Sequence, residues 1–313
     1  MNMRGRDAVS SFLVGLGLCM TVGSRCLAQA WLPPAGELTF ATSFQRVEGK
    51  GHFLDDGSRL PGYRTRASNM QFELSYGISD RLAVDLSLPY VKVKYLGPEE
   101  PLNLPTNKLD DGANHGAFAD VTAQVRIRAI DGPVTLTPFF AASVPSHDYP
   151  TIGEASAGAG FPVLQVGLSG GRLFDVVLPC FVQGTYSYAF VRQDVGVPLD
   201  HSNVELSAGV VVAEGLQVSL LWRKQWAHGG MTFDELYAAP PGIFLNMDRL
   251  TRQSFQHVGV AAGYQLTESM SVHANYVSFN SGVDAHFGHS FSAGLSWSRQ
   301  LLRQEDPFAE RRK

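Results

Sequence analysis

Apolar and polar residues alternate one by one in short runs between residues 37 and 299. The clearest example is the hairpin at 69–89, where Met70 and Phe72 begin a series of apolar residues separated by polar ones, with a turn at 77–80. Successive side chains of a β-strand point to opposite faces, so a period of two gives each strand one apolar and one polar face. The pattern predicts an all-β fold.

Twelve strands of this kind are expected, with short connections alternating with long ones. This alternation and an even number of strands are typical of β-barrels in bacterial outer membranes. We therefore predict a closed antiparallel transmembrane β-barrel of about 12 strands, with short periplasmic turns, long external loops, an apolar outer face and a polar lumen. The predicted strands are 37–47, 66–77, 82–93, 119–129, 134–144, 163–170, 176–191, 203–212, 216–227, 256–265, 270–279 and 290–299.

The N-terminus has the features of an export signal. Arg4 and Arg6 precede an apolar stretch at 8–22, and Ala-Gln-Ala at 28–30 offers a cleavage site. No later segment has the roughly 18 consecutive apolar residues that a membrane helix needs. These features predict export to the bacterial outer membrane. The expected organisation is a cleaved signal peptide at 1–30, one barrel domain at 31–299 and a polar periplasmic tail at 300–313.

Composition limits the other function classes. The net charge of -4 is spread along the chain, and no basic patch for nucleic acid is expected. Two of the three cysteines leave with the signal, so Cys180 has no partner for a disulfide. The nine histidines lack a metal-binding spacing, and we predict neither a metal nor a cofactor. Residues 167–171 match the G-x-S-x-G pattern of hydrolases, but a strand follows where that motif needs a helix. No enzymatic activity is predicted.

Aromatic and proline positions add detail to the barrel prediction. Aromatic residues fall on the apolar faces near both ends of the strands, which predicts two belts at the membrane interfaces. These residues are Tyr76, Tyr264 and Trp297 near short turns, and Tyr188, Phe190 and Trp226 near long loops. Proline cannot donate to a neighbouring strand, so Pro89, Pro138 and Pro179 are predicted at bulges.

Several of these segments resemble a known family. The run from Glu73 to Tyr90 resembles the signature hairpin of the phenol-degradation meta-pathway (MetA-type) outer-membrane transporters. Residues 116–121 resemble the Gly-x-Gly-Asp that begins that family's next strand, with Ala119 in place of the second glycine. A Gly/Ala-rich loop at 155–161 is also similar. The resemblance spans most of the mature chain and implies an outer-membrane β-barrel that transports aromatic or other hydrophobic compounds.

Residues on the polar faces of the strands are the candidates for the lumen. Pairing about Ser79 would place Glu73 directly opposite Asp85, and these like charges would repel. Arg126 and Arg128 are predicted to neutralise them from the neighbouring strand. The cluster is either a structural brace or a ring that selects solutes by charge. The predicted lumen-lining residues are Glu73, Asp85, Gln124, Arg126, Arg128, Glu205, Arg223, His257 and His273.

Twelve strands give a narrow bore that a loop, or the segment 31–35, can occlude. The longest loop carries apolar residues, including Phe233, Tyr237 and Phe244. These loop residues predict an apolar entry site or an inward-folded constriction. Contact with lipopolysaccharide and packing within the loop are the alternatives. We expect a passive channel for small aromatic or hydrophobic solutes, with outer-membrane lipid, lipopolysaccharide and the barrel assembly machinery as partners. The alternatives are a plugged structural or surface-binding barrel and, with less support, a barrel lipid hydrolase.

Overall fold

The structure is a computed structural model that describes residues 30–97, 109–175, 177–192, 196–240, 243 and 246–302. Thirteen strands and two short helices lie in these ranges. The first strands are β1 (Glu37–Phe53), β2 (Arg59–Ser79), β3 (Leu82–Tyr95), β4 (His115–Phe118), β5 (Asp120–Ile127), β6 (Thr135–Pro145) and β7 (Val163–Asp175). They are followed by β8 (Pro179–Val191), β9 (His201–Ala213), β10 (Leu216–Ala227), α1 (Phe233–Tyr237), α3 (Met247–Leu250), β11 (Ser254–Thr267), β12 (Met270–Val283) and β13 (Ala285–Gln300).

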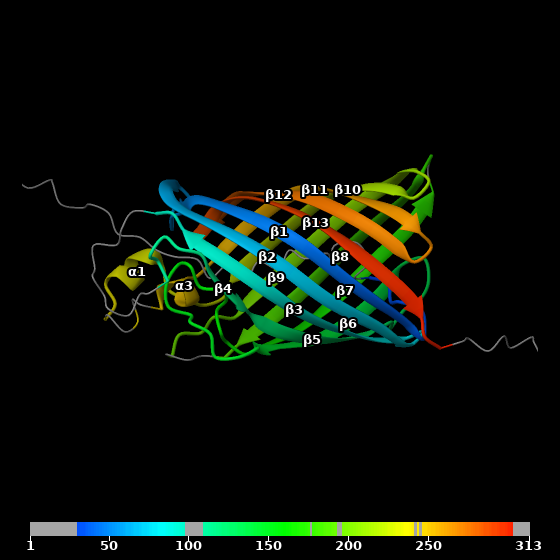
Figure 1. Cartoon of the computed structure of the whole chain (residues 1–313), viewed down its shortest axis with the longest axis horizontal. Coiled ribbons are helices and arrows are strands. Elements are labelled where there is room, and N and C mark those ends of the chain that lie inside the picture. Colours follow the sequence, from blue (N-terminus) through cyan, green and yellow to red (C-terminus); the bar gives the residue numbers. More distant parts are fainter. Residues whose placement is uncertain are drawn as a thin grey trace, which may run out of the picture.

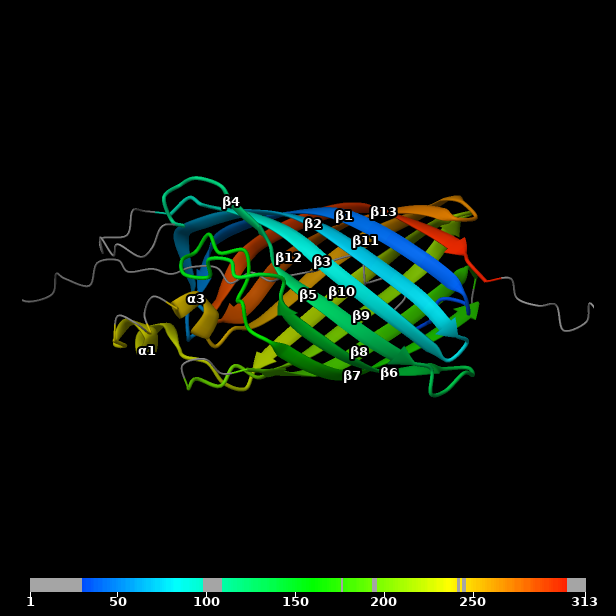
Figure 2. The same ribbon diagram turned by 60° about the horizontal axis from the view of Figure 1, so that its bottom comes forward.

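All thirteen strands belong to one antiparallel sheet that closes into a cylinder (Figures 1 and 2). The barrel closes because β1 pairs with β2 on one side and with β13 on the other. β4 and β5 both pair with β3 and lie end to end, so they occupy one position in the barrel. The prediction of a closed antiparallel barrel of 12 strands is therefore confirmed, with one of the strands interrupted.

Pro89 accounts for the interruption. Proline has no amide hydrogen to donate to the neighbouring strand. Tyr90 pairs with Phe118, and Ser87 pairs with Thr122. Between these pairs the chain from β4 to β5 holds three residues, whereas β3 holds two. The extra residue forms a β-bulge, and the amide of Ala119 donates to the Pro89 carbonyl at 2.9 Å.

Pro138 also lies at a bulge, as predicted. Arg126 pairs with Phe139 and Ile130 with Leu136, so three residues of the chain after β5 face the two residues 137–138. The prediction for Pro179 is wrong. Pro179 is the first residue of β8, where no earlier ladder bond is lost. Strand ends accept proline for the same reason that bulges do, because no donor is required there.

The long connections and both helices lie at one end of the barrel, which we call the long-loop end, and the short turns lie at the other, the short-turn end (Figure 1). Both ends of the barrel domain meet at the short-turn end. The amide of Gly36 donates to Gly77 O in the β2–β3 turn, and the amide of Leu301 donates to Gly36 O. The predicted signal peptide, apart from Ala30, and most of the predicted tail lie outside the described residues.

Several strands extend further toward the long-loop end than predicted. β1 continues to Phe53 and β2 begins at Arg59, beyond the predicted limits at 47 and 66. These extensions carry exposed charged side chains such as Lys50 and Arg64. The apolar alternation therefore stops at the edge of the membrane band, whereas the backbone ladder continues past it.

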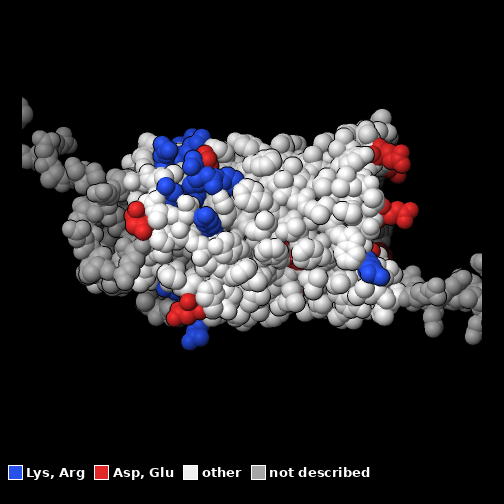
Figure 3. Space-filling model, in the orientation of Figure 1, with Lys and Arg blue, Asp and Glu red and all other residues white. Residues whose placement is uncertain are grey.

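The outer wall is apolar through the middle of the barrel, where Figure 3 shows a broad band with almost no charged side chains. Large apolar side chains such as Phe44, Leu86 and Leu220 are exposed there, while Gln45 and Gln71 on the inner wall are buried. This is the reverse of a water-soluble protein and the pattern of a lipid-facing barrel. The aromatic belts are found as predicted, with Tyr264, Trp297, Phe190 and Trp226 all exposed on the outer wall. Among the described residues, no helix combines the length and hydrophobicity of a membrane span.

Candidate functional site: the barrel lumen

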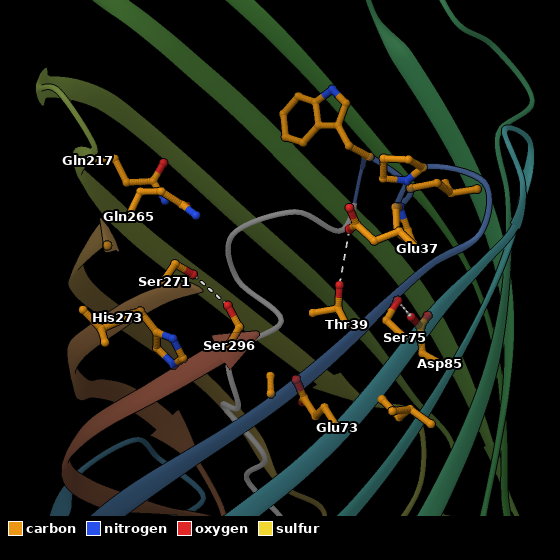
Figure 4. A pocket seen from close by; sticks show the side chains of 18 of the residues that line it. Glu37, Thr39, Glu73, Ser75, Asp85, Gln217, Gln265, Ser271, His273 and Ser296 are labelled. Carbon is orange, nitrogen blue, oxygen red and sulfur yellow. Dashed lines mark hydrogen bonds between the residues drawn. The ribbon is translucent and has the colours of Figure 1, made fainter. Parts of the chain in front are cut away.

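The lumen contains a cavity of about 670 Å³ at the short-turn end. Figure 4 shows polar side chains from opposite walls pointing into it. Five of the sequence-predicted lumen residues line this cavity: Glu73, Asp85, Gln124, Arg126 and His273. The strand parity deduced from the alternating pattern is therefore the parity seen in the structure.

An ion pair between Arg126 and Asp85 dominates one wall of this cavity. Arg126 Nε donates to Asp85 Oδ2 at 2.7 Å and Nη2 donates to Oδ1 at 2.8 Å, which makes the pair bidentate. The hydroxyl of Ser75 also donates to Asp85 Oδ1 at 2.6 Å. Both charges lie mostly out of solvent, with side-chain exposures of 10% for Arg126 and 18% for Asp85. Bidentate pairing is the strongest common geometry for two such groups.

The same arginine holds the N-terminal segment inside the lumen. Arg126 Nη1 donates to the carbonyl of Trp31 at 3.0 Å, and Thr137 Oγ1 donates to the carbonyl of Ala30 at 2.8 Å. The segment passes so close to β7 that a Cβ on Gly171 would lie 2.6 Å from the Cβ of Ala30. Residues Trp31–Pro34 also line the cavity. Residues 31–34 therefore occupy part of the bore, which is one of the two ways of occluding it that the sequence allowed.

Two details of the predicted charge cluster are wrong. Glu73 pairs with Ser87, while Asp85 pairs with Ser75, because the turn pairs Ser79 with Leu82 and the register then shifts by one residue between Ser79 and Gly77. Glu73 and Asp85 are thus displaced along the strands rather than directly opposed. Arg128 lies near the β5–β6 turn and pairs with Asp131 at 3.0 Å. Only Arg126, of the two arginines, joins Asp85.

The predicted histidines occupy different heights in the barrel. His273 pairs with Gly263 and lines the cavity, whereas His257 pairs with Phe279, nearer the long-loop end. His257 is 2% exposed and lies between two rings, with centroid distances of 4.5 Å to Phe255 and 4.1 Å to Phe279. The two imidazoles therefore do not form a pair. Among the described residues, no group of three His, Cys, Asp or Glu side chains is placed to hold a metal ion.

A second cavity of about 310 Å³ lies at the long-loop end. Arg223 lines it and forms an ion pair with Glu205 on the adjacent strand, with Nε 3.4 Å from Oε1. Arg249, which the sequence did not single out, also lines it, with its guanidinium 3.9 Å from the ring centroid of Phe161. Arg249 comes from α3 in a loop, so strand alternation gave no signal for it.

Apolar residues fill another part of the bore at the long-loop end. Wall residues such as Val47, Val91 and Phe279 pack with loop residues that include Leu109 and Tyr149. Tyr149 also donates a hydrogen bond to Asp120 at the start of β5. This apolar cluster ties the loops to the inner wall and narrows the lumen.

The longest loop packs upon itself and upon the rim. Phe233, predicted as part of an access site or constriction, is 7% exposed and packs with Phe161, Leu236 and Leu250. The amide of Phe233 donates to Asp284 Oδ1 at 3.3 Å. Tyr237 ends α1, and Phe244 lies outside the described residues. Thr232 and Glu235 form a reciprocal capping box that fixes the start of α1.

The G-x-S-x-G match is part of a regular strand. Ser169 lies within β7, opposite Thr185 of β8, and the two hydroxyls are 2.9 Å apart. It is 2% exposed and no helix follows it. The strand–turn–helix elbow that a serine nucleophile needs is therefore absent at this position.

Comparisons with known proteins show the fold. No protein-family model matches the sequence, and no curated protein matches it significantly. Among solved structures, the COG4313 outer membrane channel from Pseudomonas putida F1 is similar, with a TM-score of 0.63 and 13% identity over 87% of this chain and 97% of that chain. The translocator domain of the autotransporter NalP from Neisseria meningitidis is less similar, with a TM-score of 0.49 and 12% identity over 85% and 89%. The chain therefore folds as an outer-membrane-type β-barrel.

Proposed function

We propose that this chain is a channel of the outer membrane through which small molecules diffuse passively. The observation that carries the proposal is the cavity of about 670 Å³ that the inner wall leaves beside the N-terminal segment. Cavities of roughly 300–1,000 Å³ are typical of sites for small molecules. A barrel with a purely structural role has no need of such a space, because side chains can fill a small bore.

We further propose that the chain is a MetA-type transporter and that its solutes are aromatic or hydrophobic. The cavity at the long-loop end is lined by the rings of Phe161 and Phe255 and by the guanidinium groups of Arg223 and Arg249. An aromatic ring can pack on such rings, and a carboxylate attached to it can pair with a guanidinium group. Small aromatic acids fit this combination better than neutral sugars do.

The proposal carries an orientation. The short turns face the periplasm and the long loops face outward, as in other barrels of this class. Export through a cleaved signal peptide and insertion by the barrel assembly machinery follow from that location, and lipid and lipopolysaccharide would surround the wall.

Uptake into liposomes by the refolded protein tests the proposal. A small phenolic acid should enter faster than a sugar of similar size. Equal rates would replace selective diffusion with a general pore. Arg249 lies outside the membrane band. The substitution Arg249→Gln should reduce the preference for the acid without lowering sugar uptake.

A plugged structural barrel is the second candidate, and one observation favours it. The apolar cluster formed by Val91, Phe279, Tyr149 and their neighbours fills part of the bore at the long-loop end. If the refolded barrel shows neither conductance nor uptake of either solute, while its heat-modifiable gel mobility is normal, the plugged barrel is the better description.

A further inference from the structure

A concentrated positive patch lies on the outer wall of the barrel, at the long-loop edge of the apolar band. Figure 3 shows Lys and Arg side chains gathered there, over β1–β3. The neighbouring strands bring them together although they are far apart in the sequence. The patch consists of Arg46, Lys50, Arg64, Arg66, Lys92 and Lys94.

The backbone register places four of these cations in two adjacent rows. Arg46 pairs with Ser68, and Ser68 pairs with Lys92, which forms the first row. Glu48, Arg66 and Lys94 form the second row in the same way. Strands lie about 4.8 Å apart and alternate residues about 6.6 Å apart along a strand, so the four cations fall within an area of about 10 by 7 Å.

The patch has little internal neutralisation. Glu48 is the one carboxylate among the described residues 46–50, 64–66 and 92–94. Its Oε1 is 4.0 Å from Arg46 Nε and 3.5 Å from Arg66 Nε, so two arginines share one charge. Lys50, Lys92 and Lys94 form no ion pair with any described residue. Six cations facing one carboxylate leave a strong local excess of positive charge in a protein whose net charge is -4.

Directly beneath the patch the wall is apolar. Phe44 pairs with Met70, and Met70 pairs with Tyr90, which gives a row of exposed apolar side chains one step nearer the short-turn end than Arg46. The surface therefore presents several cations immediately above a wall that contacts acyl chains. A ligand that matches it carries more than one phosphate and has its acyl chains directly below them.

We propose that this patch is a binding site for the bis-phosphorylated glycolipid of the outer leaflet, with the patch cations on its phosphates and the row Phe44–Met70–Tyr90 against its acyl chains. Guanidinium groups bind phosphate oxygens in a bidentate manner, and lysines add point charges. Because the outward direction of the long loops follows from the proposed function, lipid binding is measured in detergent, separately from solute uptake. A failure of solute uptake would therefore not affect the lipid-binding result, and a failure of lipid binding would not affect the uptake result.

Binding of bis-phosphorylated lipid A to the refolded protein in detergent tests the site. The variant Lys50→Gln/Lys92→Gln/Lys94→Gln removes three cations that form no ion pair with a described residue. Since each cation near an anionic surface contributes about 1 kcal/mol, its affinity should fall by about 100-fold. The matched control Arg81→Gln/Arg172→Gln/Lys224→Gln removes the same charge from other parts of the barrel and should bind as the parent does.

The probes distinguish other sources of binding. Dephosphorylated lipid A and phosphatidylglycerol should both bind at least tenfold more weakly than the bis-phosphorylated lipid, and inorganic phosphate should not displace it. Equal binding of either lipid, displacement by phosphate, or equal losses in patch and control variants would overturn the proposal. Heat-modifiable mobility checks folding. If the triple variant does not fold, Lys92→Gln/Lys94→Gln should still bind roughly 30-fold more weakly.

Discussion

Arg126 offers the sharpest test of how the N-terminal segment is held in the lumen. The substitution Arg126→Gln removes the hydrogen bond to the Trp31 carbonyl and both bonds to Asp85. We expect the segment to leave the bore more often and uptake through the barrel to rise. Cleavage after Ala30, as the proposed export requires, would make the effect larger, because it would remove the carbonyl that Thr137 contacts.

The magnitude follows from the bonds that are lost. A hydrogen bond from a charged donor contributes about 1.5–3 kcal/mol, and the lower value applies where water in the cavity competes. A loss of about 1.5 kcal/mol shifts the balance between seated and released segment by roughly tenfold. Where the seated segment limits flux, uptake of every small solute should rise by up to the same factor.

Two measurements report this shift. Liposome uptake measures flux, and acrylamide quenching measures the exposure of Trp31 once Trp222, Trp226 and Trp297 are replaced by Phe. Both should increase in Arg126→Gln. The double variant Asp85→Asn/Arg126→Gln should show the same increases in uptake and in quenching as Arg126→Gln. It breaks the same contact to Trp31 without changing the net charge.

Ser271→Ala is the matched control, since Ser271 lines the same cavity and bonds to Ser296 rather than to the segment. It should leave flux and quenching unchanged. If Arg126→Gln also leaves both unchanged, the hydrogen bond to Trp31 does not hold the segment and the reasoning fails.

Three further expectations concern the wall and the loops. Leu220 is 67% exposed on the lipid face, so Leu220→Arg should cost about 2–4 kcal/mol in urea titrations of folding into vesicles, whereas Leu220→Ile should cost little. Phe233→Ala should loosen the long loop by about 3 kcal/mol and speed its proteolysis roughly 100-fold, while the strands stay protected. Burial raises the pKa of the Asp284 carboxyl at the β12–β13 tip. An acid with a raised folded-state pKa contributes stability below its unfolded pKa and loses it as the pH rises through the folded pKa. Protection of the Phe233 amide from hydrogen exchange should therefore weaken as the pH rises through the folded-state pKa of Asp284. Asp284→Asn should remove this dependence on pH. If Asp284→Asn has the same pH profile as the parent, the expectation is wrong.

The fold could be predicted because apolar and polar residues must alternate along every strand of a lipid-facing barrel. One face of each strand contacts lipid and the other faces the lumen, so the sequence alone indicated on which face residues such as Phe72 and Gln71 lie. Strand ends were less readable, since the extensions of β1 and β2 lie beyond the apolar band. In these extensions the strands are held by backbone hydrogen bonds, which leave no pattern in the sequence.

The site was predicted less completely, because it depends on register and loops. The turn at Ser79 and the register shift beside Gly77 place Glu73 away from Asp85, and alternation cannot reveal this displacement. The positive patch was missed for a related reason. Its cations come from three strands, and they look evenly spread in the sequence until the pairing of Arg46, Ser68 and Lys92 brings them together.

The two ends of the bore differ in what opening would require. At the long-loop end, Val91, Phe279 and their loop partners would have to expose apolar surface to water, at about 25 cal/mol for each Å². At the short-turn end, releasing the segment breaks the hydrogen bonds to Arg126 and Thr137 and exposes the buried side chains of Ala30 and Leu32. This costs less, because fewer apolar side chains are exposed than in the cluster at the long-loop end. Under the proposed function, solute would pass beside the apolar cluster, through the cavity that Arg249 lines, and the segment at Arg126 would set how often the other end is open. On this reasoning Arg249→Gln changes the ratio of aromatic-acid to sugar uptake, whereas Arg126→Gln raises both rates together.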